Sequence, residues 1–213
     1  MKEEIDELFE EYRQELKDDG ALEFFKTHGK VCQNSQDQLR LVEALTEEDP
    51  KVVDRALRMM AELEITNPWY DLGTIVVLGK SVQYKTPRKT HKFAKMHDVP
   101  DVATWKKKVF THVSSLLPED WVPSEGMVRV RYRVYHEIPK TTAAARRILM
   151  EAGVLLREKT PDWDNNAKSA LDALKLVLWL DDNQIVDGGS AKYYSRKPRA
   201  EMDMEYRVKR FDK

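Results

Sequence analysis

The sequence contains a single cysteine, Cys32, among its 213 residues and no long apolar run. One thiol cannot form a disulfide within the chain, and it excludes a zinc site built from several cysteines. No run approaches the roughly 18–20 apolar residues that cross a bilayer, so we expect no membrane span. The acidic, amphipathic start, residues 1–14, is unlike a signal or transit peptide. We therefore expect a protein of the reducing cytoplasm that has no contact with membranes.

The chain also has little net charge, −1, but its two parts differ in sign. Residues 1–65 carry 18 acidic and 9 basic side chains, a balance of −9. The remainder carries 27 basic and 19 acidic side chains, a balance of +8. An excess of basic charge confined to one part favours a polyanionic partner for that part alone.

The N-terminal part, residues 1–66, is predicted to be a small all-helical region. Apolar side chains recur at helical spacing over residues 3–18, and Gly20 is expected to end that helix. A helix is also predicted over 36–46, and Asp49-Pro50 supplies the cap and first-turn proline that start another. One interpretation of the acidic faces is simple solvation. The other is a module for oligomerisation or for docking a phage protein, because a negative surface repels DNA.

A change from helical to alternating periodicity at Thr66–Pro68 predicts a second domain, residues 67–213. We expect an α+β fold there, a mixed β-sheet with packed helices. The predicted strands are 74–78, 127–138, 154–157 and 202–208. The predicted helices are 102–117, 141–152 and one that Asn165 or Asn166 caps, and Gly188-Gly189 is predicted to be a turn.

Three groups of basic side chains are candidates for DNA contact. A segment after the first strand interleaves basic and aromatic residues, the strand 127–138 carries an arginine stripe, and the helix 141–152 contains an arginine pair. Such groups hold phosphates and stack on unpaired bases, and the alternative for each is a solvated loop or sheet face. The candidates are Lys85, Arg88, Lys89, Lys92, Arg129, Arg131, Arg133, Arg146 and Arg147.

Acidic residues gather in KTPDWDNNAKSALDALKLVLWLDDNQIV, residues 159–186. Asp162 and Asp164 are separated by one residue, and Pro161 favours extended backbone just before them. Both carboxylates project to the same side if this segment stays extended.

The same stretch continues with a lysine and further carboxylates. Lys168 and Asp172 are four residues apart and share one face of the predicted helix. The pair Asp181-Asp182 follows at a turn, where one aspartate is expected to be a metal ligand and the other a structural partner. Clustered carboxylate oxygens suit hard cations such as Mg²⁺ or Mn²⁺, and with a phosphate substrate they suggest metal-assisted phosphodiester cleavage. The alternative is a solvated turn followed by an amphipathic helix.

The ordered motif P-D-x-D-N-x-x-K, L-D-A-L and D-D-x-Q-[IV] resembles the signature of RusA-type Holliday junction resolvases. These are metal-dependent endonucleases, often carried by phages and prophages. The resemblance covers roughly residues 70–210 and is strongest over 138–206. It implies a RusA-like fold and a homodimer that resolves four-way DNA junctions by phosphodiester hydrolysis.

The resemblance also implies roles for individual residues. Asp162, Asp164 and Asp182 match the family's metal ligands, for Mg²⁺ with Mn²⁺ able to replace it, and Lys168 matches its catalytic lysine. Asp172 and Asp181 are candidate accessory residues. Two departures from the family pattern are Trp163, between the first two aspartates, and Lys175-Leu176, where many members have small turn residues.

Two further functions are alternatives to junction resolution. One is a broader nuclease acting on flaps or forks during phage DNA processing, which nothing in the sequence separates from a resolvase. The other is a catalytically silent DNA-binding regulator with the same fold, against which the intact aspartates and Lys168 argue.

Overall fold

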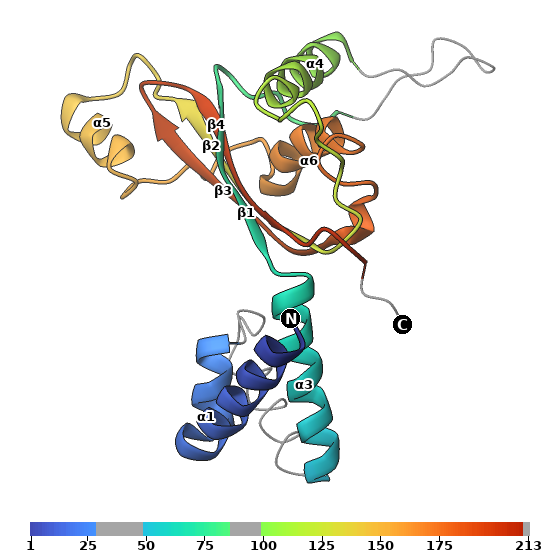
Figure 1. Cartoon of the computed structure of the whole chain (residues 1–213). Coiled ribbons are helices and arrows are strands. Elements are labelled where there is room, and N and C mark those ends of the chain that lie inside the picture. Colours follow the sequence, from blue (N-terminus) through green and yellow to red (C-terminus); the bar gives the residue numbers. More distant parts are fainter. Residues whose placement is uncertain (29–48, 86–98, 211–213) are drawn as a thin grey trace. The chain divides into compact units, whose positions relative to one another are not determined.

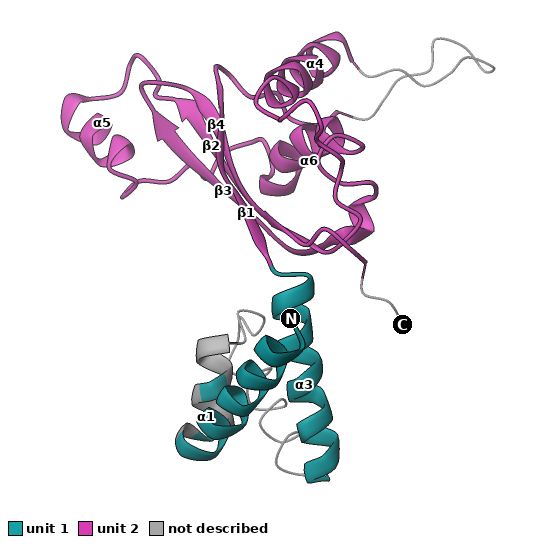
Figure 2. Cartoon of the chain, in the orientation of Figure 1, with its two compact units in different colours: residues 1–68 teal, residues 69–213 magenta. Residues whose placement is uncertain are grey.

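The computed structural model describes residues 1–28, 49–85 and 99–210. The chain forms two compact units, Met1–Pro68 and Trp69–Lys213 (Figure 2). The division lies beside the boundary predicted after residue 66. Over the described ranges, no helix combines the length and apolar character that crossing a membrane requires.

The first unit is helical, as the sequence predicts. Helix α1 (Lys2–His28) is interrupted at Gly20, whose φ of 75° is costly for any residue with a side chain. Helix α3 (Pro50–Thr66) begins where predicted, and the Asp49 side chain accepts a hydrogen bond from the Lys51 backbone N–H. The predicted helix 36–46 lies outside the described residues. The two helices enclose a small core of Phe9, Tyr12, Phe24, Leu57 and Ala61.

The second unit is built on a four-stranded mixed sheet, which confirms the α+β prediction (Figure 1). Its strands are β1 (Tyr70–Leu78), β2 (Val128–Glu137), β3 (Ile185–Ser195) and β4 (Arg199–Tyr206). The spatial order is β1-β4-β2-β3. Strand β4 pairs antiparallel with both β1 and β2, whereas β2 and β3 are parallel.

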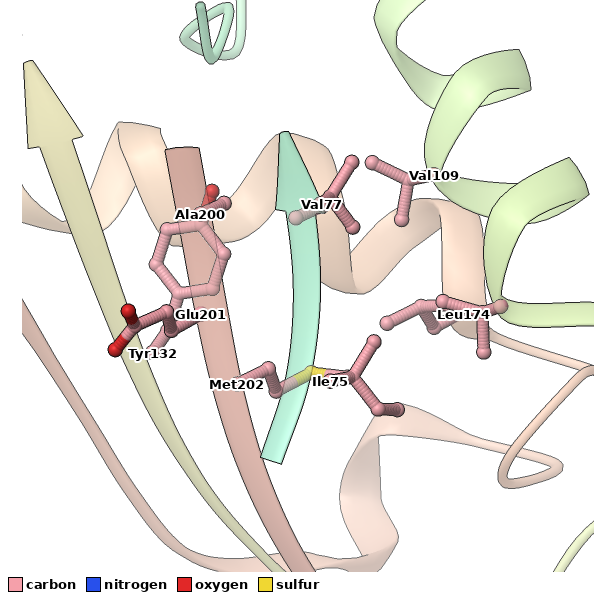
Figure 3. Close-up of a pocket in the computed structure, with 10 residues that line it drawn as sticks. Ile75, Val77, Val109, Tyr132, Leu174, Ala200, Glu201 and Met202 are labelled. Carbon is pink, nitrogen blue, oxygen red and sulfur yellow. The ribbon is translucent and has the colours of Figure 1, made fainter. Parts of the chain in front are cut away.

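One face of the sheet carries the core. Alternation along β2 buries every second side chain from Val128 to Val134, as expected for a sheet covered on one side. Helices α4 (Pro100–Ser114) and α6 (Trp163–Leu174) pack on this face. Figure 3 shows side chains of the strands meeting Val109 of α4 and Leu174 of α6. The space left among them is about 10 Å³, no more than one water molecule, so this is a closed core.

A third helix of this unit, α5 (Ala144–Glu151), lies beside the end of β3. Met150 packs there against Ile138 and Tyr194. The Glu151 carboxylate accepts hydrogen bonds from the Ser195 hydroxyl and the Arg196 backbone N–H, at 2.8 and 2.7 Å. These contacts join α5 to the turn between β3 and β4.

Two of the predicted elements are wrong. Residues 154–157 are irregular and make one backbone hydrogen bond to β3, from Arg157 to Lys192, which is too few for a strand. Gly188-Gly189 is not a turn but lies inside β3. A Cβ at residue 189 would lie 2.8 Å from a guanidinium nitrogen of Arg131, so a side chain there would require the flexible end of Arg131 to shift.

Candidate active site

Helix α6 begins earlier than predicted, and this changes the setting of the first two aspartates. Asp162 is the N-cap, with extended backbone (φ −62°, ψ 151°), and Asp164 already lies in the first helical turn. The predictions of a shared extended segment and of a cap at Asn165 or Asn166 are therefore wrong. The backbone N–H and the side-chain amide of Asn166 both donate to the Asp162 carbonyl, which extends the helix back to this residue.

Strand β3 and α6 itself fix the backbone around these aspartates. The Ser190 hydroxyl donates to the Trp163 carbonyl at 2.8 Å, and the Lys192 ammonium donates to the Pro161 carbonyl at 2.9 Å. Asn166 is fully buried and donates from its side chain to the Asp162 carbonyl at 3.3 Å. The start of α6 is thus held against the sheet while its acidic side chains point outward.

The carboxylates of Asp162 and Asp164 are exposed and uncommitted. Neither has a hydrogen-bond or ion-pair partner within the residues that the structure describes, and Asp162 makes no capping bond. Trp163 between them is 59% exposed, which leaves a large aromatic ring in solvent beside the two acids. Free oxygen donors of this kind match the ligand chemistry that Mg²⁺ and Mn²⁺ prefer.

Lys168 lies on the face of α6 that also carries Asp164 and Asp172. Its ammonium is 4.4 Å from the centre of the Tyr84 ring, a cation–π contact. The Tyr84 backbone N–H donates to the Asn165 carbonyl at 2.7 Å, which ties the segment after β1 to the helix. Tyr84 belongs to the segment of interleaved basic and aromatic residues after the first strand, and its position against Lys168 depends on chain packing, which the sequence does not reveal.

The remaining acids lie in the last turns of α6 and in the segment that follows it. Two of them, Asp172 and Asp181, already have hydrogen-bond or ion-pair partners. Asp172 pairs with Lys106 of α4 at 3.1 Å. Asp181 caps the short 3₁₀ helix Asp182–Gln184, and the backbone N–H of Asn183, followed by the nearby Lys175 ammonium, lowers its pKa. Asp181 is therefore engaged in local structure.

Asp182 is exposed and keeps acceptor capacity. One of its oxygens accepts a hydrogen bond from the indole N–H of the buried Trp179 at 3.1 Å. The other oxygen has no partner in the described part of the chain. Of the adjacent aspartates, Asp182 is thus the one with an oxygen free for a cation.

The three predicted metal ligands do not come together within one chain. Asp162 and Asp164 lie at the start of α6, whereas Asp182 lies near Lys175, just past its end. A helix of 12 residues is about 18 Å long. Across residues 1–28, 49–85 and 99–210, no group of three His, Cys, Asp or Glu side chains is close enough to hold a metal ion. The predicted convergence of the three aspartates is therefore not formed within this chain.

The arginine stripe of β2 is engaged in ion pairs across the outer face of the sheet. Arg129 pairs with Glu205 and Arg131 with Asp187, each at 3.1 Å. Arg133 pairs with both Glu201 and Asp203, and these bonds raise its pKa. The strand order places the acidic residues of β4 directly beside β2, which alternation along β2 alone could not reveal.

The other candidate DNA contacts are differently placed. Lys85 pairs with Asp101 at the start of α4 at 2.5 Å. Arg146 and Arg147 of α5 are exposed and have no ion-pair partner in the described part of the chain. Arg88, Lys89 and Lys92 lie outside the described residues. DNA contact by any of these side chains stays a prediction.

Comparison with known proteins gives the family. The family model described as Endodeoxyribonuclease RusA matches residues 79–205. The chain belongs to the RusA endodeoxyribonuclease family. The matched part of this RusA family member runs from the end of β1 through β4, so it contains α6 and both acidic groups. The helical unit, Met1–Pro68, lies outside it.

One curated relative is similar to more than half of this chain. The chain is 32% identical over 137 residues to the uncharacterized protein YqaN of Bacillus subtilis (strain 168). The similarity covers 62% of this chain and 94% of that protein.

Proposed function

We propose that this RusA family member is a metal-dependent, structure-selective endonuclease that resolves four-way DNA junctions by phosphodiester hydrolysis. The supporting observation is the pair of exposed carboxylates at the N-terminus of α6, which have no partner among the described residues, with Lys168 one helical turn beyond. Phosphodiester cleavage needs an activated water and neutralisation of the charge that develops on phosphate. Acidic groups held on a fixed backbone beside a cationic side chain suit both needs.

Asp162 and Asp164 are the residues that would hold Mg²⁺, with Mn²⁺ able to replace it and Asp182 as a further ligand. A bound ion would polarise the phosphate and lower the pKa of a coordinated water. Lys168 would face the scissile phosphate, where its ammonium stabilises negative charge. Tyr84 holds that ammonium through its ring, and the Lys106–Asp172 pair neutralises the carboxylate one turn beyond Lys168.

We further propose that the active form is a homodimer. Two related active sites suit a four-way junction, in which symmetry-related strands must both be cut. The separation of Asp182 from Asp162 and Asp164 within one chain supports a dimer in which acids from both copies contribute to each site. The acidic N-terminal unit is a candidate for oligomerisation or for docking a phage protein, and its charge of −9 makes DNA contact unfavourable.

The experiment compares labelled four-way junctions, flaps and linear duplex, with and without Mg²⁺. We expect junction cutting that requires the metal and that Asp164→Asn abolishes, while junction binding stays equal or becomes tighter because a negative charge is lost. Asp120→Asn, at an exposed aspartate in the loop after α4, is the matched control and should cut normally. Preferential cutting of flaps would favour the broader nuclease, and absence of all cutting would favour a silent DNA-binding protein.

A further inference from the structure

A group of cations without ion pairs in the described part of the chain lies around α5, separate from the arginine stripe. Lys140, Arg147 and Arg196 are all exposed, and none of their side chains has a hydrogen-bond or ion-pair partner among the residues that the structure describes. The arginines of β2, in contrast, are each paired with acids of β3 or β4. A cation that is already paired with a carboxylate contributes less to the binding of a polyanion than an unpaired cation does.

These three cations surround a hollow of about 490 Å³. Ile138, Pro139 and Ile148 give it an apolar lining, and Glu137 is the acid that lines it. Three cations against one carboxylate leave an excess of positive charge around a surface that accepts an apolar group. The deoxyribose–phosphate backbone of DNA presents that combination, since its charged phosphates alternate with apolar sugar faces.

The hollow is built by tertiary contacts. Lys140 follows β2, Arg147 belongs to α5, and Arg196 lies in the turn after β3. The Glu151 carboxylate holds the backbone of that turn against α5 through the N–H of Arg196. Because this bond uses the backbone, it fixes the position of Arg196 and leaves its guanidinium free.

We propose that this hollow binds the sugar–phosphate backbone of a duplex arm of the DNA substrate through Lys140, Arg147 and Arg196. The inference rests on the proposed function and adds a second point of contact with the substrate. Along β3, Ser190 contacts the start of α6 and Arg196 lies six residues further on. At about 3.3 Å per residue this is about 20 Å, or about six base pairs of DNA at 3.4 Å each. The hollow therefore contacts an arm about six base pairs from the cleavage point.

The first test measures the salt dependence of junction binding for full-length Arg147→Gln/Arg196→Gln. The homodimer of this variant loses two phosphate contacts in each copy, which should lower the slope of log K against log salt by about 3.6. Its affinity should therefore fall about 150-fold less between 50 and 200 mM salt than that of the wild type. Arg55→Gln, at an exposed arginine on α3 of the acidic first unit, is the matched control and should leave the slope unchanged. An unchanged slope in the double variant, or an equal drop in the control, would overturn the proposal.

The second test locates the contact on the DNA. Neutral methylphosphonate linkages are placed one at a time along one arm of the junction. Wild-type binding should weaken for linkages about five to seven base pairs from the cleavage point, by the spacing given above, and the double variant should show no such loss. If the wild type and the double variant lose the same binding affinity at those linkages, the hollow does not contact the DNA there.

Cutting of the bound junction, measured separately with Mg²⁺, distinguishes this proposal from the proposed function. A double variant that binds weakly but cuts once saturated supports both proposals. If the wild type shows the arm contact but cuts no junction, the hollow is still a DNA-binding site, and the proposed nuclease activity is wrong.

Discussion

The Lys168 ammonium and the Tyr84 ring, 4.4 Å apart, join the segment that follows β1 to the central turn of α6. The contact is fixed on the tyrosine side, because its backbone N–H donates to the Asn165 carbonyl and Val82 accepts from the Ser169 hydroxyl at 2.5 Å. Lys168 carries no ion pair in the described part of the chain, so the ring restrains a cation that remains free to meet phosphate.

Replacing the Tyr84 ring should therefore lower the rate of cutting more than it lowers binding. A cation–π contact of about 0.5–2 kcal/mol corresponds to a fall in kcat of about 2- to 30-fold for Tyr84→Leu. Tyr84→Phe keeps the ring and should cut at nearly the wild-type rate. Single-turnover cleavage of a saturated junction gives the measurement. Equal losses in both variants would show that the hydroxyl, and not the ring, matters.

Shared active sites predict recovery of activity when two inactive variants are combined. Asp164→Asn and Asp182→Asn should each be inactive alone. Coexpressed as mixed dimers, they should cut again, because one site of each heterodimer would contain neither substitution, about a quarter of all sites in an equal mixture. Junction cleavage by the coexpressed protein checks this. No recovery, with heterodimers verified by tags, would mean that each site belongs to one chain.

The buried His136 predicts a stability loss under mildly acidic conditions. Burial, and after it the charges of Arg157, Lys192 and Lys80, lower its pKa to about 4 from the ordinary 6.5. As the pH falls, the unfolded chain therefore binds a proton at His136 at a higher pH than the folded chain does. The contribution of the neutral histidine to the free energy of unfolding is fully present above pH 6.5 and is lost as the pH falls toward 4. Between pH 7 and pH 5 the loss should be about 2 kcal/mol in urea unfolding.

The matched histidine controls separate His136 from the many carboxylates of the chain. His136→Gln should remove the pH dependence over that interval, whatever its effect on stability at pH 7. His112→Gln, on the last turn of α4, should retain it. A wild-type dependence that survives in His136→Gln would assign the proton to another group.

The acidic unit should not contribute to DNA affinity. Residues 69–213 form a compact unit with their own core, so the shortened chain is expected to fold, which circular dichroism checks. Removing the negative charge should leave junction binding equal or tighter in titrations. A folded but weakly binding fragment would make the helical unit a DNA contact. A fragment that becomes monomeric and loses paired cutting would assign oligomerisation to that unit.

Local chemistry determined much of what the sequence predicts. The proline after Asp49 starts α3, Gly20 interrupts α1, and strict alternation makes β2 a strand with one buried face. These features depend on neighbours a few residues away, so the pattern alone carries them. The ordered aspartates and Lys168 likewise indicate the family without any knowledge of their positions in space.

Only the tertiary structure decided which charges are free. The order β1-β4-β2-β3 places Glu201, Asp203 and Glu205 beside the arginines of β2, and the end of β3 brings Arg196 to α5. The length of α6 separates Asp182 from Asp162 and Asp164, residues that the sequence groups in one motif. Electrostatic and cation–π interactions depend on distance through space, and distance between elements remote in the chain is set by strand pairing and packing, which no local pattern records.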